Sequence, residues 1–109
     1  MLTIDIHSNK ETVNDAKNMC DGAIKMARKD RDRILCLIVG YGSKGTAHKI
    51  RSAILELLEE YKTKKIIKDY INGTELDIFN VKYQSFIGAD RIPEVEKKKR
   101  NPGAIYISL

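Results

Sequence analysis

A continuous apolar run, Ile34-Leu35-Cys36-Leu37-Ile38-Val39, constrains the fold of this chain more than any other feature. A charged stretch precedes the run, and Gly40 ends it. A short apolar run without polar alternation is typical of a strand that is buried on both faces, as in the middle of a parallel sheet. The run therefore predicts a central strand around which the rest of the chain is arranged.

The segment before this run has the patterns of a strand and a helix. Residues 2–7 alternate between apolar and polar side chains, which predicts a half-buried strand. Small or apolar residues recur every three or four positions over residues 12–28, which predicts an amphipathic helix. Two capping boxes compete for the start of this helix: Thr12 with Asp15, and Ser8 with Glu11.

The segment after the run begins with glycines and continues with a second helix. Gly40, Gly42 and Gly45 make a flexible junction between the strand and this helix. Apolar residues repeat with helical period over residues 50–61, so we expect this helix to pack on the same sheet. At the far end of the chain, residues 104–109 alternate again and predict a closing strand.

The stretch between the second helix and the closing strand has weaker patterns. Residues 66–71 suit a short helix that Asn72-Gly73 ends as a left-handed cap, although Asn-Gly is also a strong hairpin signal. Apolar residues within 76–86 are expected to pack a short helix or an irregular segment against the core. Residues 94–100 form a charged run that we expect to be solvated.

The order strand, helix, strand, helix and late strand predicts an α/β fold. We expect a compact two-layer sandwich of the βαβαβ type, with a small mixed sheet and helices mainly on one face. The other face would then be partly free for a ligand or a partner. A chain of 109 residues has the length of one domain, so we expect a single domain over residues 1–109.

Net charge and the two cysteines limit the partners and the cellular compartment that we expect for this chain. Twenty Lys and Arg against fifteen Asp and Glu leave a net charge of +5, which favours an anionic partner such as nucleic acid, or else a basic surface without such a ligand. We expect no membrane association and a cytoplasmic location, because neither a bilayer-length apolar run nor a signal-peptide pattern is present. Cys20 and Cys36 lack the spacing of a zinc site or a redox pair and are expected to be buried free thiols.

Asp5 and His7 are the first candidates for chemistry. They lie two residues apart near the end of the first predicted strand, so their side chains leave the same face of the strand. A carboxylate beside an imidazole orients it and raises its pKa, which suits a general base or acid. The alternative is a surface pair that caps a loop or the next helix.

The loop Gly40-Tyr41-Gly42 is the second candidate. It leads into a helix, where unpaired backbone N–H groups and the helix dipole can hold a phosphate. The spacing matches neither a Walker loop nor a complete dinucleotide fingerprint, and a tight turn that needs glycine is the alternative. Tyr41 is the aromatic residue best placed to stack on a base.

Basic residues are the third set of candidates. Lys44, His48 and Arg51 form one stripe at the start of the second helix, and this stripe is either a phosphate clamp or a solvated helix face. Lys98 and Arg100 belong to a basic run that can follow a phosphate backbone or can be ordinary solubilising surface.

Taken in order, three segments resemble the Smr domain, the small MutS-related module. They are Ile4-Asp5-Ile6-His7-Ser8, then Val39-Gly40-Tyr41-Gly42 with Ile50-Arg51, and finally Asn101-Pro102-Gly103-Ala104-Ile105-Tyr106-Ile107. The resemblance places Asp5 and His7 at the acidic and imidazole positions of the family's first motif, and Arg51 at its helix arginine. Two departures are Ser8, where the family has glycine, and Val39, where the family has a polar residue.

The resemblance implies a compact α/β domain that binds DNA or RNA, and some members nick or cleave it. In an endonuclease, Asp5 would orient His7 as the general base, and Arg51 would stabilise charge on the phosphoryl group. We expect no tightly held metal ion or other cofactor, with Mg²⁺ entering only in a nuclease reaction. The alternatives are a non-catalytic RNA-binding or ribosome-associated module and a protein-interaction adaptor.

Overall fold

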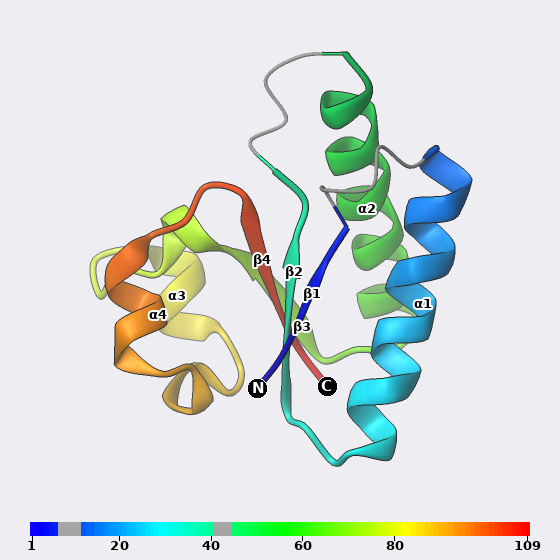
Figure 1. Ribbon diagram of the computed structural model, residues 1–109. Coiled ribbons are helices and arrows are strands. Elements are labelled where there is room, and N and C mark those ends of the chain that lie inside the picture. The colour runs from blue at the N-terminus through cyan, green and yellow to red at the C-terminus, as the bar shows by residue number, and fades with distance from the viewer. Residues whose placement is uncertain (7–11, 41–44) are drawn as a thin grey trace.

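The computed structural model describes residues 1–6, 12–40 and 45–109 (Figure 1). The elements in chain order are β1 (Leu2–Asp5), α1 (Val13–Lys29), β2 (Ile34–Ile38), α2 (Gly45–Thr63), β3 (Asp69–Asn72), the 3₁₀ helix η2 (Gly73–Glu75), α3 (Val81–Ser85), the 3₁₀ helix η3 (Ala89–Arg91), α4 (Glu94–Lys99) and β4 (Ala104–Ser108).

The four strands form one mixed sheet in the order β1-β2-β4-β3. Strand β1 runs parallel to β2, whereas β4 runs antiparallel to both β2 and β3. The helix α1 is the crossover that parallel pairing of β1 and β2 requires. The mixed sheet with long helices between its first strands confirms the α/β fold expected from the sequence.

The two long helices α1 and α2 lie side by side over one face of the sheet, and the short helices α3 and α4 lie on the other side (Figure 1). Each face therefore has its own core. The larger core joins α1 and α2 to the sheet and includes Ala16, Cys20, Leu35, Leu37, Ile54, Leu58, Ile105 and Ile107. The smaller core lies under the short helices and contains Ile34, Cys36, Ile71, Leu76, Phe86, Ile92, Ala104 and Tyr106.

The short-helix layer leaves the outer face of β1 open. Thr3 and Asp5 are exposed, although Thr3 pairs in register with Cys36, which is buried in the smaller core. Because cross-strand neighbours share a face of the sheet, the two exposed residues lie on the face that α3 and α4 cover further along. The sequence pattern predicts that one face of the sheet is partly free, and the exposed part of that face is the part formed by β1.

Local sequence signals specify α1 well. The Thr12 hydroxyl accepts a hydrogen bond from the Asp15 amide at 3.2 Å, and the Asp15 carboxylate accepts one from the Thr12 amide at 3.4 Å. This reciprocal pair is a capping box, as predicted, while the rival Ser8 and Glu11 lie outside the described residues. Cys20 and Cys36 are buried free thiols, also as predicted.

The prediction of a helix over residues 66–71 is wrong. Residues Asp69–Asn72 form β3, an edge strand, and alternate residues face opposite cores: Tyr70 packs against the larger core and Ile71 lies in the smaller one. Pairing with β4 therefore overrides the local helical pattern. Asn72 has φ −75° and ψ 149°, so it is extended and does not form a left-handed cap.

The prediction for residues 76–86 is correct only in part. Leu76 and Phe86 are buried, but Ile78 is 66% exposed, Phe79 84% and Val81 77%. The segment turns away from the sheet between its two anchors, and this apolar turn faces solvent. The charged run at residues 94–100 forms the exposed helix α4, which is tied to the sheet by a hydrogen bond from the Tyr106 hydroxyl to Glu96 at 3.0 Å.

Within the part of the chain that the structure describes, no helix is both long and apolar enough to span a membrane.

Candidate functional site

The carboxyl ends of β1 and β2 lie side by side at one end of the sheet. At this site, the edge means this end of the sheet, where these two strands terminate. Asp5 pairs in register with Ile38, and the Ile6 amide donates to the Ile38 carbonyl at 2.9 Å. Gly40 follows two residues after Ile38, and α2 begins at Gly45 on the same side of the sheet (Figure 1). Parallel pairing thus brings two sequence-predicted residues, Asp5 and Gly40, to the edge where α/β sheets usually bind ligands.

Three backbone segments meet next to this edge, at what we call the glycine junction: Gly40, Gly73 and the turn Asn101–Gly103. A β-carbon at Gly103 would lie 3.2 Å from the α-carbon of Gly40, and a β-carbon at Gly73 would lie 2.1 Å from the carbonyl oxygen of Asn101. Gly40 also has φ 76°, a conformation that side chains disfavour. Glycine at these positions allows the three segments to approach closely.

Arg51 of α2 ties the three segments of the junction together. Its Nη1 donates to the carbonyl oxygens of Gly40 at 3.3 Å and of Pro102 at 3.0 Å, and its Nη2 donates to Oδ1 of Asn72 at 2.7 Å. Arg51 is half-buried. One side chain therefore connects the end of β2, the end of β3 and the turn before β4.

Asn72 links Arg51 to a carboxylate on η2. Oε1 of Glu75 accepts hydrogen bonds from the Asn72 side-chain amide at 3.0 Å and from its backbone amide at 3.2 Å. Oε2 of Glu75 pairs with Lys82 at 3.3 Å. Burial raises the pKa of Glu75, but the hydrogen bonds from Asn72 and Lys82 outweigh burial, and the pKa lies below its ordinary value.

The acceptors around Arg51 are neutral, unlike the carboxylate partners of Lys62 and Lys82. Lys62 pairs with Asp69 at 3.1 Å, and Lys82 pairs with Glu75. Arg51 instead bonds two carbonyls and an amide, and among the described residues no carboxylate forms an ion pair with it. The contacts within the described residues therefore orient its positive charge without neutralising it.

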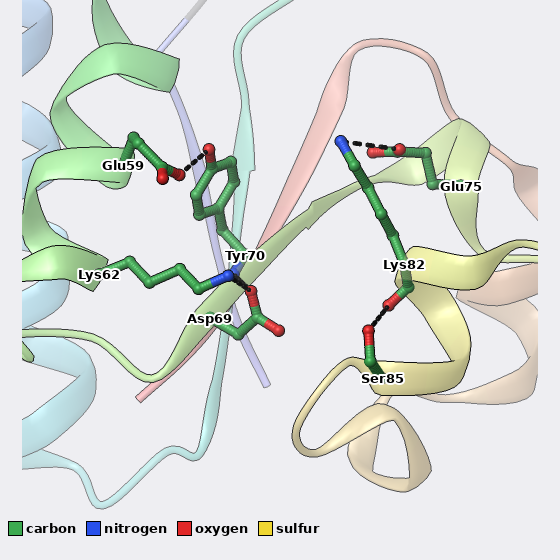
Figure 2. A pocket seen from close by; sticks show the side chains of 7 residues that line it. All are labelled: Glu59, Lys62, Asp69, Tyr70, Glu75, Lys82 and Ser85. Carbon is green, nitrogen blue, oxygen red and sulfur yellow. Dashed lines mark hydrogen bonds and ion pairs between the residues drawn. The ribbon is translucent and has the colours of Figure 1, made fainter.

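A polar cleft of about 150 Å³ lies along the outer edge of β3. It is lined by Glu59, Lys62, Asp69, Tyr70, Glu75, Lys82 and Ser85. Figure 2 shows Glu59 and Lys62 of α2 on one side of β3, and Lys82 and Ser85 of α3 on the other.

The charged groups of this edge cleft are paired with one another. The Tyr70 hydroxyl donates to Glu59 at 2.6 Å, and burial together with this carboxylate raises the pKa of Tyr70. The outward backbone amides of Tyr70 and Asn72 donate to the carboxylates of Asp69 and Glu75. These side chains occupy the donors of an edge strand and block its pairing with another strand.

The other predicted residues lie at several places. His48 is exposed on α2, and Lys98 is exposed on α4. Arg100 pairs with Asp77 at 3.3 Å. Lys98 and Arg100 line a groove of about 190 Å³ on the short-helix side, together with Leu76, Asp77, Ile78, Tyr83, Glu94 and Lys97. The structure thus brings Gly40 and Arg51 into contact and places Lys98 and Arg100 in a separate groove.

Four predicted residues, His7, Tyr41, Gly42 and Lys44, lie outside the described residues. Within the described ranges, no group of three or more His, Cys, Asp or Glu side chains is arranged to hold a metal ion.

Sequence reasoning missed Asn72 and Glu75 as site residues. The Asn-Gly pair is a signal for backbone conformation, and it draws attention away from the Asn72 side chain. The three-residue spacing from Asn72 to Glu75 is that of a capping box, and this signal is present in the sequence. Its link to Arg51 depends on tertiary contact and has no local signature.

The whole chain has the fold of an Smr domain, as comparison with a solved structure shows. The crystal structure of the Smr domain of Thermus thermophilus MutS2 superposes on this chain with a TM-score of 0.61 and 22% sequence identity. The match covers 100% of this chain and 98% of that domain. It confirms the fold that the three sequence motifs predict. No protein-family model and no curated protein matches the chain.

Proposed function

We propose that this Smr-fold protein binds nucleic acid, DNA or RNA, at the carboxyl ends of β1 and β2 beside the glycine junction. The observation that carries the proposal is the Arg51 guanidinium, which is half-buried and held by neutral acceptors. A partly desolvated charge without a counterion is energetically unfavourable. An anion therefore gains more binding free energy by pairing with this charge than by pairing with a fully solvated lysine. A phosphate group fits this requirement, because a guanidinium forms directed hydrogen bonds to its oxygens.

The surroundings of Arg51 favour an anionic ligand further. The net charge of +5 attracts a polyanion at long range. The 19-residue helix α2 begins next to this edge, and the positive end of its dipole favours negative charge. His48 is exposed near the start of α2. Nucleic acid meets these conditions with several phosphates at once.

Other predicted residues extend the proposed site. Tyr41, Gly42 and Lys44 follow Gly40 in the chain, so they are proposed to supply backbone N–H groups, a stacking ring and a cation to the same phosphate track. Lys98 and Arg100 are proposed as secondary phosphate contacts from the separate groove on the short-helix side.

Cleavage is the extension of this proposal, and it rests on Asp5 and His7. Asp5 ends β1 at the proposed binding edge, and His7 follows two residues later. In this mechanism the imidazole of His7 takes the proton of a water or a ribose hydroxyl, whose oxygen attacks the phosphorus while the leaving oxygen departs. Asp5 orients the imidazole. If the reaction used Mg²⁺, Asp5 is the residue that would hold it, and the ion would stabilise negative charge at the phosphate. A binding module without cleavage is the alternative.

The two buried free thiols support a reducing compartment, and we propose a cytoplasmic location.

The test is a binding and cleavage assay with fluorescein-labelled single-stranded and duplex RNA and DNA. The proposal predicts binding that weakens steeply as salt rises, and the loss of any cleavage in His7→Ala while binding persists. Salt-sensitive binding without cleavage in the unmodified protein would establish the binding module and exclude the nuclease. The absence of binding at low salt would refute the proposal.

A further inference from the structure

Asn72 occupies an unusual position, between a cation and an anion. Its Oδ1 accepts from Arg51 at 2.7 Å, and its Nδ2 donates to Glu75 at 3.0 Å. A guanidinium only donates and a carboxylate only accepts, so the orientation of the Asn72 amide is fixed by its two partners. Glu75 also accepts from the backbone amide of Asn72, which fixes the main chain at the same point.

The chemistry of an amide at this position differs from that of a carboxylate. An amide oxygen orients a guanidinium but leaves its charge unchanged, whereas an aspartate would form an ion pair with Arg51. The charge of Glu75 is already balanced by Lys82 at 3.3 Å, and Glu75 is separated from Arg51 by the Asn72 amide. The network therefore holds Arg51 in place without supplying a counterion.

We infer that Asn72 is a positioning residue that fixes the Arg51 guanidinium at the glycine junction and leaves its positive charge available to phosphate. This inference rests on the proposed function and extends it, because it names the residue that sets the affinity of that site for phosphate. Glu75 holds Asn72 through hydrogen bonds from its side-chain and backbone amides, and Lys82 balances the charge of Glu75 on the side away from Arg51.

The most informative substitution is Asn72→Asp. The new carboxylate retains an acceptor for Arg51 but neutralises its charge, while the contact with Glu75 becomes repulsive. We expect affinity for labelled oligouridine and for labelled duplex DNA to fall about tenfold or more at low salt, the equivalent of one strong charged contact. The magnitude of the salt slope, the negative slope of log K against log salt, should also decrease by about one, because one phosphate contact is lost.

Two further variants separate positioning from folding. Asn72→Asp combined with Glu75→Gln removes the repulsion between the two carboxylates but keeps the ion pair with Arg51, so affinity should remain low in a folded protein. Asn72→Ala leaves the guanidinium without its third acceptor and should also lower the salt slope. A residue with only a structural role would change the unfolding midpoint and would leave the salt slope unchanged in the folded fraction.

The matched control is Asn80→Asp, which adds the same charge at another position. Asn80 accepts a hydrogen bond from the Lys82 amide at 2.8 Å as the N-cap of α3, a role that aspartate also fills. We expect this variant to bind nearly as the unmodified protein does. A second comparison adds Asn72→Asp to Arg51→Gln, and there the salt slope should decrease no further.

Each outcome supports or overturns a defined claim. A folded Asn72→Asp protein that binds like the unmodified one overturns the inference, as does an equal loss in Asn80→Asp, which would indicate a general charge effect. If the unmodified protein binds but Arg51→Gln binds equally well, the proposed site itself is wrong. The failure of the inference and the failure of the proposed function are thus distinguished by the Arg51 variant.

Discussion

Gly73 lies against the carbonyl of Asn101 so closely that a β-carbon at Gly73 would stand 2.1 Å from the carbonyl oxygen. This contact joins the end of β3 to the turn before β4, and it lies beside Asn72 in the glycine junction. Close approach of two backbones, and not a left-handed conformation, is the reason for glycine at this position.

Gly73→Ala is expected to destabilise the protein by about 1–3 kcal/mol or more, because the carbonyl of Asn101 must move to accommodate the methyl group. The matched control is Gly22→Ala. Gly22 lies exposed inside α1, and a β-carbon added there would meet nothing within 4 Å, so alanine should stabilise the protein by roughly 0.5–1 kcal/mol. Urea unfolding of both variants measures the difference, and equal effects would contradict the close contact.

The two phenylalanines of this chain are expected to respond in opposite ways to truncation. Phe86 is 6% exposed in the smaller core, so Phe86→Ala should cost about 3–5 kcal/mol. Phe79 is 84% exposed, and Phe79→Ala should change stability by less than about 0.5 kcal/mol. Chemical denaturation checks both values. A large loss in Phe79→Ala would place that residue in the core and refute the exposed turn.

Glu75 should give the protein a defined sensitivity to acid. Its pKa in the folded state is lowered, so its contribution to stability is present above the unfolded pKa of about 4.3 and is lost as pH falls through the lower folded value. Glu75→Gln should therefore flatten the dependence of unfolding free energy on pH below about 4.3. Glu60→Gln is the control. Lys64 lowers the pKa of Glu60 as well, but this pair is exposed, so high salt should screen its effect on stability. If high salt removes the Glu75 effect as well, Glu75 is not held as described.

The two cysteines are expected to be inert in the folded protein. Burial, the larger cause, and the nearby carboxylate of Asp21 raise the pKa of Cys20 to about 12, and burial raises the pKa of Cys36 to about 11. Thiol alkylation at pH 8 should therefore proceed only as fast as the protein unfolds, and urea should expose both thiols. Labelling of either thiol in the native state at the rate of free cysteine would contradict the burial.

The same raised pKa values predict a loss of stability in alkali. A thiol whose pKa is higher when folded contributes stability below its unfolded pKa of about 8.5, and this contribution disappears as pH rises toward the folded value. Replacing Cys20 by alanine should remove its share of the decline. Unfolding measurements between neutral and alkaline pH test this expectation.

Most of the fold follows from local patterns in the sequence. The apolar run at β2 and the helical periods of α1 and α2 are long enough to specify an element by themselves. Strand β3 has four residues, and its alternation of Tyr70 and Ile71 is too short to be recognised. Its conformation depends on pairing with β4, more than thirty residues later in the chain, which no local pattern records.

The candidate site likewise contains residues that sequence motifs indicate and residues that only tertiary contacts reveal. Gly40 and Arg51 belong to short motifs with fixed spacing, and the structure places them in contact. Asn72 joins them through a hydrogen bond to a residue 21 positions away, and that relationship exists only in the folded chain. Motifs thus single out Gly40 and Arg51 in the sequence, whereas the groups that orient Arg51 are set by tertiary structure.

The salt dependence of nucleic-acid binding tests the central claim most directly. The measurement compares the unmodified protein with Arg51→Gln and with Lys64→Gln, using labelled single-stranded RNA between about 50 and 200 mM salt. Lys64 pairs with Glu60 just beyond the end of α2, at the opposite end of that helix from the proposed site. We predict that Arg51→Gln makes the negative slope of log K against log salt shallower by about one, while Lys64→Gln leaves it unchanged. Equal slopes for the two variants, or the absence of binding at low salt, would contradict the account.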